Sequence, residues 1–180
     1  MEVVLNKDQI VEESEKVFQR LLDFCNQLPD EVFFGIPEGK WTIAQHVQHL
    51  VISTKTATAA YAIPKFIVRL IGGRSKRQSI SFHELTTRYQ RKLQDGGKAN
   101  GRYLPADIQA ASGKAVLRKW QKTSAAYLQV LKKNWPDNKL DDYLVPHPLL
   151  GKITLRELCY FTIHHTEHHL KGIKRQSLLF

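Results

Sequence analysis

Three segments of this chain begin with a capping box, and apolar residues at helical spacing follow each box. The capping pairs are Asn6 with Gln9, Thr42 with Gln45, and Thr154 with Glu157. In such a pair, each side chain accepts a hydrogen bond from the other residue's backbone N–H, which fixes the first turn of a helix. No alternation of apolar and polar residues typical of a strand competes with these segments. The pattern therefore favours an all-α fold.

The apolar periodicity predicts four long helices, over about residues 7–28, 42–61 and 113–134 and from residue 155 onward. Between the second and third lie a short apolar and basic segment at 64–71, a helix at about 82–93 and an irregular stretch at 98–112. Loops are predicted at 37–39 and, leading tightly into the last helix, at 147–152. Four amphipathic helices with one long crossover predict a four-helix bundle, as a single domain spanning residues 1–180.

The composition is that of an ordinary soluble globular protein, with 42% hydrophobic residues and a mean hydropathy of −0.36. No apolar run approaches the roughly 20 residues of a membrane span, and the first residues do not resemble a signal peptide. Cys25 and Cys159 both occupy apolar positions of predicted helices. We therefore expect buried free thiols, a reducing cytoplasm and no membrane association.

Most of the net charge of +10 comes from the predicted crossover. Between Pro64 and Arg102, ten basic residues stand against two acids, so this segment carries +8. A solvated face is the commoner explanation of such a segment. Nucleic-acid binding is disfavoured, because aromatic residues do not alternate with the basic ones. The alternative is attraction of an anionic small-molecule substrate or cofactor, with Arg69, Arg74 and Arg77 as candidates.

Four of the eight histidines lie between residues 164 and 169, inside the last predicted helix. Helical phase places His165 and His169 on the apolar stripe of this helix. The same phase places His164 and His168 on the opposite side, which we expect to face water together with the other polar-side residues. These residues are Glu157, Tyr160 and Lys171.

Two buried imidazoles four residues apart can hold one metal ion, because their side chains point the same way. The alternative is a pair of core histidines hydrogen-bonded to backbone or water. The sequence also contains the inverted zinc-peptidase pattern H-x-x-E-H, with His164 and His168 as ligands and Glu167 as base. That pattern is disfavoured because all three residues lie on the expected wet side. It also needs a distant carboxylate ligand, and only twelve residues follow His168.

The second predicted helix contributes two further histidines. Its apolar stripe passes through Ile43, Val47 and Leu50. His46 lies near the edge of that stripe and His49 lies further round, so phase alone favours His46 as the inward histidine.

Two blocks of the sequence resemble the DinB-like superfamily. The first runs from Gly39 to Leu50, GKWTIAQHVQHL, and is similar to that superfamily's G-x-W-[ST] block ending in His-Leu. The second joins His147-Pro148-x-x-Gly151-Lys152-x-Thr154-Leu155 to His165-x-x-x-His169 and resembles the loop before its last helix and the helix itself. The order of the blocks and the four-helix prediction agree with the resemblance over nearly the whole chain.

This resemblance implies a divalent metal held by His49, His165 and His169. His46, one turn before His49, is then either a neighbour that supports the site or a surface residue. Three imidazole ligands leave an open coordination position and suit zinc or nickel. Members of the superfamily include enzymes that transfer a low-molecular-weight thiol and others that look like hydrolases. The resemblance therefore implies a thiol S-transferase or a hydrolase, and a possible homodimer. A non-catalytic bundle that binds metal or ligand is the alternative. No protein nucleophile is required, so Cys159 is expected to pack in the core.

Overall fold

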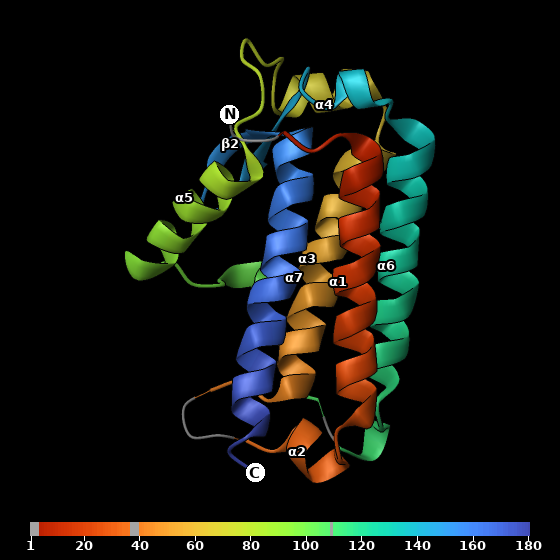
Figure 1. Ribbon diagram of the computed structural model, residues 1–180, viewed down its shortest axis with the longest axis vertical. Coiled ribbons are helices and arrows are strands. Elements are labelled where there is room, and N and C mark those ends of the chain that lie inside the picture. Colours follow the sequence, from red (N-terminus) through yellow and green to blue (C-terminus); the bar gives the residue numbers. More distant parts are fainter. Residues whose placement is uncertain (1–3, 37–39, 109) are drawn as a thin grey trace.

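The computed structural model describes residues 4–36, 40–108 and 110–180. Four long helices stand side by side along the molecule (Figure 1): α1 (Lys7–Gln27), α3 (Ile43–Ala62), α6 (Ala115–Asn134) and α7 (Leu155–Ser177). Helices α1 and α3 each pack against both α6 and α7. The predicted all-α four-helix bundle is therefore confirmed. The loop predicted at 37–39, and with it Gly39, lies outside the described residues.

The three predicted capping boxes are all formed. The side chains of Asn6, Thr42 and Thr154 accept from the backbone N–H three residues on, and the returning bonds from Gln9, Gln45 and Glu157 are present. Aromatic residues fill the centre of the bundle: the rings of Phe18 and Trp120 meet edge to face with centroids 5.2 Å apart. No helix of the described ranges is long and apolar enough to cross a membrane.

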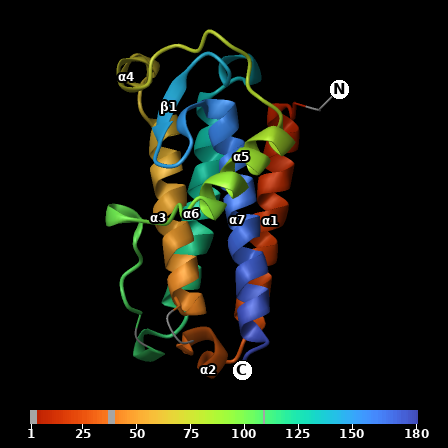
Figure 2. The ribbon, with the colours of Figure 1, turned by 90° about the vertical axis from the view of Figure 1, so that its left-hand side faces the viewer.

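The long crossover returns the chain to the opposite end of the bundle, so that α3 and α6 run in the same direction (Figure 2). It contains α4 (Lys65–Ile71), α5 (Phe82–Gln94) and short 3-10 turns at Gly101–Tyr103 and Ala110–Ser112. A further short helix, α2 (Asp30–Phe34), connects α1 to α3. Helix α5 lies across α7, and the segment after it passes along α3.

A β-hairpin precedes α7, where the sequence predicted a loop and no strands. Strand β1 (Leu144–His147) pairs antiparallel with β2 (Gly151–Thr154), with Leu144 opposite Thr154 and His147 opposite Gly151. Each strand has four residues, which is too short for an alternating pattern to be recognised. The imidazole Nδ1 of His147 accepts the backbone N–H groups of Leu149 and Leu150, at 3.2 and 3.1 Å, and so holds the turn closed.

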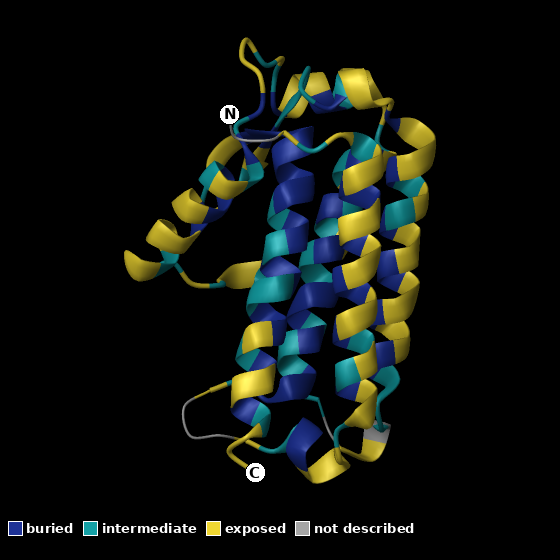
Figure 3. Cartoon of the chain, in the orientation of Figure 1, coloured by how far each residue is buried: buried dark blue, intermediate teal, exposed yellow. Residues whose placement is uncertain are grey.

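The side of α7 predicted to face water is largely covered. Glu157 and Tyr160 are fully buried, and His164 and His168 are half-buried. Figure 3 shows buried residues on much of α7, whereas α1 and α6 expose a continuous outer face. The prediction was wrong because the crossover, rather than water, occupies this side. Glu157 accepts hydrogen bonds from the guanidinium of Arg77 and the backbone N–H of Ile80.

Candidate metal centre

Three imidazoles from two helices converge between α3 and α7. His49 comes from α3, and His165 and His169 come from successive turns of α7. The Nε2 atom of His165 lies 3.1 Å from the Nε2 atoms of both His49 and His169. All three side chains are buried, with exposed fractions of 6%, 4% and 8%. Their potential ligand atoms lie within 4.8 Å of one another.

Each of the three rings is held from behind through its Nδ1 atom. The Nδ1 of His49 lies 2.7 Å from the backbone oxygen of Tyr103. The Nδ1 of His169 lies 2.9 Å from the Nδ1 of His46, and that of His165 lies 3.4 Å from the hydroxyl of Ser53. Metal-binding histidines commonly have their second ring nitrogen bonded in this way, which fixes the ring's orientation and tautomer.

The hydrogen-bonding partners determine where the protons sit. A backbone carbonyl only accepts, so neutral His49 carries its proton on Nδ1 and presents a lone pair at Nε2. The Ser53 hydroxyl donates to the carbonyl of Leu50 at 3.2 Å and can therefore accept from Nδ1–H of His165. With the same arrangement at His169, three Nε2 lone pairs face one another with no proton between them.

A divalent cation fits this donor set. Three converging lone pairs repel one another unless something positive lies between them, and imidazole nitrogen is a preferred ligand of zinc and nickel. Metal–nitrogen bonds of about 2.1 Å place neighbouring ligand nitrogens about 3.0–3.4 Å apart. This range brackets the 3.1 Å from Nε2 of His165 to Nε2 of His49 and of His169. In the alternative arrangement, a single proton on Nε2 of His165 makes a linear bond to only one of its two neighbours.

Burial keeps these imidazoles neutral. It lowers the pKa of His165 and His169 well below the ordinary value of 6.5, and neighbouring imidazoles lower it further. Burial also lowers the pKa of His49, although the carbonyl of Tyr103 partly opposes the shift. The pKa of His46 falls to about 4, first because of burial and then because of His49. A metal ion therefore does not have to displace protons from these rings at neutral pH.

The structure distinguishes between the two histidines of α3. His49 is buried in the cluster, whereas His46 is half-buried and contacts only His169 among the three. The phase argument, which favoured His46 as the inward residue, was wrong because it counted only neighbouring helices. The edge of α3 that carries His49 is covered by Tyr103 from the crossover and by the ring of Trp41, whose centroid lies 5.2 Å from that of His49.

The inverted zinc-peptidase residues do not form a site. Glu167 pairs with Arg20 and Lys171 at the surface, at N–O distances of 3.3 and 3.8 Å. The ring of His164 packs edge to face against Tyr89, and its Nε2 has no hydrogen-bond partner among the described residues.

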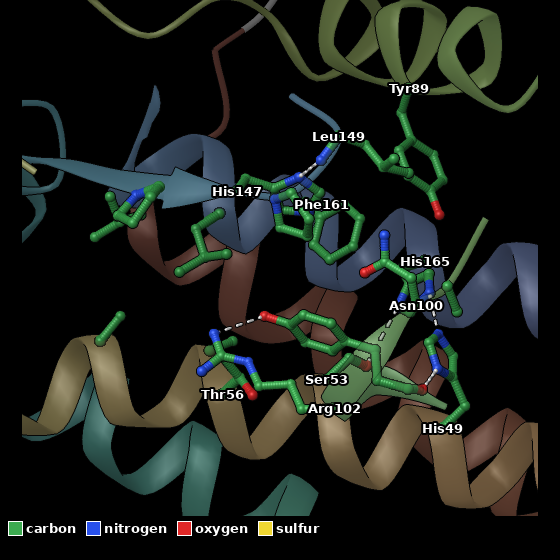
Figure 4. A pocket seen from close by; sticks show the side chains of 18 of the residues that line it. His49, Ser53, Thr56, Tyr89, Asn100, Arg102, His147, Leu149, Phe161 and His165 are labelled. Atoms are coloured by element: carbon green, nitrogen blue, oxygen red, sulfur yellow. Dashed lines mark hydrogen bonds between the residues drawn. The ribbon is translucent and has the colours of Figure 1, made fainter. Parts of the chain in front are cut away.

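A cavity of about 400 Å³ opens beside the three imidazoles. In Figure 4, His49 and His165 face each other at one side of it, with Phe161 above and Thr56 farther along α3. The cations on its lining are Lys98 and Arg102. None of the three arginines suggested by the sequence lines it. Arg77 is bound to Glu157, Arg74 lies 3.7 Å from the carboxylate of Asp142, and Arg69 is exposed on α4.

Two supporting groups were not predicted from the sequence. The carbonyl of Tyr103 leaves no signal there, because every residue has a backbone oxygen and only the path of the crossover brings this one to His49. Ser53 does leave a signal, since it lies one helical turn after His49 and shares its face.

Comparison with known proteins agrees with this architecture. The sequence profile of the DinB superfamily matches residues 13–173. Among solved structures, the crystal structure of TT2238, a four-helix bundle protein, is similar with a TM-score of 0.58 and 18% sequence identity. The similarity covers 94% of this chain and 98% of that one. It extends to the fold alone. Comparison with curated proteins gives no match.

Proposed function

The chain belongs to the DinB superfamily, and we propose that it is a divalent-metal-dependent enzyme whose metal is held by His49, His165 and His169. The observation that carries the proposal is the convergence of three Nε2 atoms, each on a ring whose Nδ1 is bonded outside the cluster. Closed structural zinc sites use four protein ligands, whereas three leave a position for a reacting molecule. Zinc and nickel are the metals we propose, because both suit imidazole.

A divalent ion at this site would lower the pKa of a bound low-molecular-weight thiol, or of water, and so supply a nucleophile at neutral pH. The thiol corresponds to an S-transferase and water to a hydrolase. The residues around the cavity would place the second reactant. The rings of Trp41 and Phe161 pack beside His49 and His165 and would shield them from water, and Lys98 and Arg102 would attract an anionic small-molecule substrate.

The two cysteines are not placed to act as nucleophiles. Cys159 is fully buried, its Sγ lies 3.0 Å from the hydroxyl of Tyr61, and burial raises its thiol pKa to about 11. Cys25 is also buried, and burial raises its pKa to about 12. Both are free thiols. Two free cysteines and no disulfide between them support the further proposal that the protein works in a reducing compartment such as the cytoplasm.

A non-catalytic metal-binding bundle is the second candidate, and the depth of the site favours it. None of the three imidazoles is more than 8% exposed, and together they join α3 to α7. In that case, removing the metal would lower the melting temperature strongly, and no electrophile would be turned over with any thiol.

Elemental analysis of the purified protein tests the site itself. We expect close to one divalent ion per chain in the wild type and in His83→Ala, which removes an exposed histidine of α5. His49→Ala and His165→Ala should lose the ion. If His46→Ala loses the metal and His49→Ala keeps it, the ligand on α3 is His46 and the assignment of His49 is wrong.

Activity is then measured on an electrophile panel with glutathione and other cysteine-based thiols, before and after chelation. Turnover that requires one particular thiol, is lost on chelation and returns when zinc or nickel is added back identifies the transferase.

A further inference from the structure

The cavity beside the imidazoles follows a single face of α3. Its lining includes six residues of α3 and Ile63, the residue directly after the helix, and all but Ala59 recur at intervals expected for one face. They are His49, Ser53, Thr56, Ala57, Ala59, Ala60 and Ile63. At a rise of 1.5 Å per residue, the distance from His49 to Ile63 along the helix axis is about 21 Å. The cavity is therefore elongated, with the proposed metal site near one end.

This wall is built from small side chains. Between His49 and Ile63, every residue of α3 that lines the cavity is Ser, Thr or Ala. Ala60 and Thr56 are half-buried, so their side chains reach the cavity rather than the packed centre of the bundle. A large residue at either position would occupy the space that the cavity now contains.

The far part of the cavity is apolar on its other sides as well. Leu158 comes from α7, Val145 from the hairpin, and Val68 and Ile71 from α4. The charged lysine and arginine of the lining, Lys98 and Arg102, both come from the loop that closes the cavity from outside. An apolar ligand is favoured on such a wall, because it removes apolar surface from water and needs no buried polar partner.

We propose that this cavity binds an elongated apolar chain whose polar, metal-binding end reaches the three histidines. The inference rests on the proposed metal site and names the substrate class for it: a molecule with an aliphatic tail lying along α3 toward Ile63 and its reacting group beside His49 and His165. Arg102 flanks the path of the tail, and its guanidinium would bind an anionic substituent on the tail. A compact, fully polar substrate would leave the apolar half of the cavity wet.

Binding of straight-chain hydroxamic acids, from acetohydroxamate to decanohydroxamate, tests the proposal on the zinc-loaded protein by isothermal titration calorimetry. The head group binds zinc, and the tail samples the groove. The dissociation constant should fall about fourfold for each added methylene until the tail fills the cavity. Ala60→Phe should stop this trend, so that decanohydroxamate binds at least tenfold more weakly than to wild type while acetohydroxamate is unchanged. The control is Ala62→Phe, which alters an exposed residue of the same helix that does not line the cavity.

The same series separates this proposal from the metal site. If hydroxamates of all chain lengths bind with equal affinity, the proposal of an elongated apolar substrate is refuted. The metal site remains supported in that case, because the head group still binds. Should no zinc be retained, straight-chain alcohols from ethanol to decanol are titrated into the metal-free protein. If the affinity for the alcohols rises with chain length in the wild type but not in Ala60→Phe, the cavity binds apolar chains even without the metal. Absence of any length dependence overturns it. Thr56→Leu serves as the second cavity-filling variant if Ala60→Phe does not fold.

Discussion

Mild acid should weaken this fold, and His147 gives a direct measure of the effect. Its Nδ1 accepts two backbone N–H groups, so it must be unprotonated for the hairpin turn to close. Burial lowers its pKa from 6.5 to about 4. In the unfolded chain, this histidine takes up its proton near pH 6.5. Between these two values the unfolded state binds more protons, so the free energy of unfolding falls as the pH falls.

The size of the effect follows from the two pKa values. A histidine whose pKa is 6.5 in the unfolded chain and about 4 in the folded protein lowers the free energy of unfolding at about pH 5 by about 2 kcal/mol relative to pH 8. His147→Asn keeps an acceptor, the amide oxygen, but removes the titration. Urea denaturation of the chelator-treated protein at both pH values should show that the variant loses about 2 kcal/mol less than the wild type. Equal losses in the two proteins would refute the assignment of Nδ1 as a protected acceptor.

Three further changes have defined outcomes. Glu157→Gln should lower the free energy of unfolding by about 2 kcal/mol in urea denaturation, because it leaves the half-exposed guanidinium of Arg77 without a charged partner. Burial alone would raise the pKa of Glu157, but Arg77 and backbone N–H groups lower it below 4.5. The ionised carboxylate therefore stabilises the fold less as the pH falls below 4.5, and the difference in free energy of unfolding between the wild type and Glu157→Gln should shrink. His46→Ala should weaken zinc binding about 10- to 100-fold in a chelator competition, since His169 loses the partner of its Nδ1; unchanged affinity would remove His46 from the site. Tyr61→Phe should cost about 1–2 kcal/mol by deleting a buried hydroxyl bonded to a backbone carbonyl at 2.8 Å, with the metal content unaltered.

The helices were predictable because their ends and faces are encoded locally. Asn6, Thr42 and Thr154 each cap a helix through a partner three residues away, and that contact depends on nothing else in the chain. The placement of His165 and His169 was equally local, because the periodicity of α7 alone turns both rings inward. The hairpin was not predictable in this way, since its pairing of Leu144 with Thr154 shows no pattern within either strand.

The errors on α7 and α3 share one physical cause, which also explains how the site is closed. A helical-phase argument treats any residue outside the apolar stripe as wet, yet the crossover covers such residues on both helices. It buries Glu157 by supplying Arg77 and the N–H of Ile80, and it buries His49 by supplying the carbonyl of Tyr103. A polar group can be buried at little cost only when such a partner arrives from elsewhere in the chain. The ring orientation of His49 therefore depends on the path of the crossover as much as on α3.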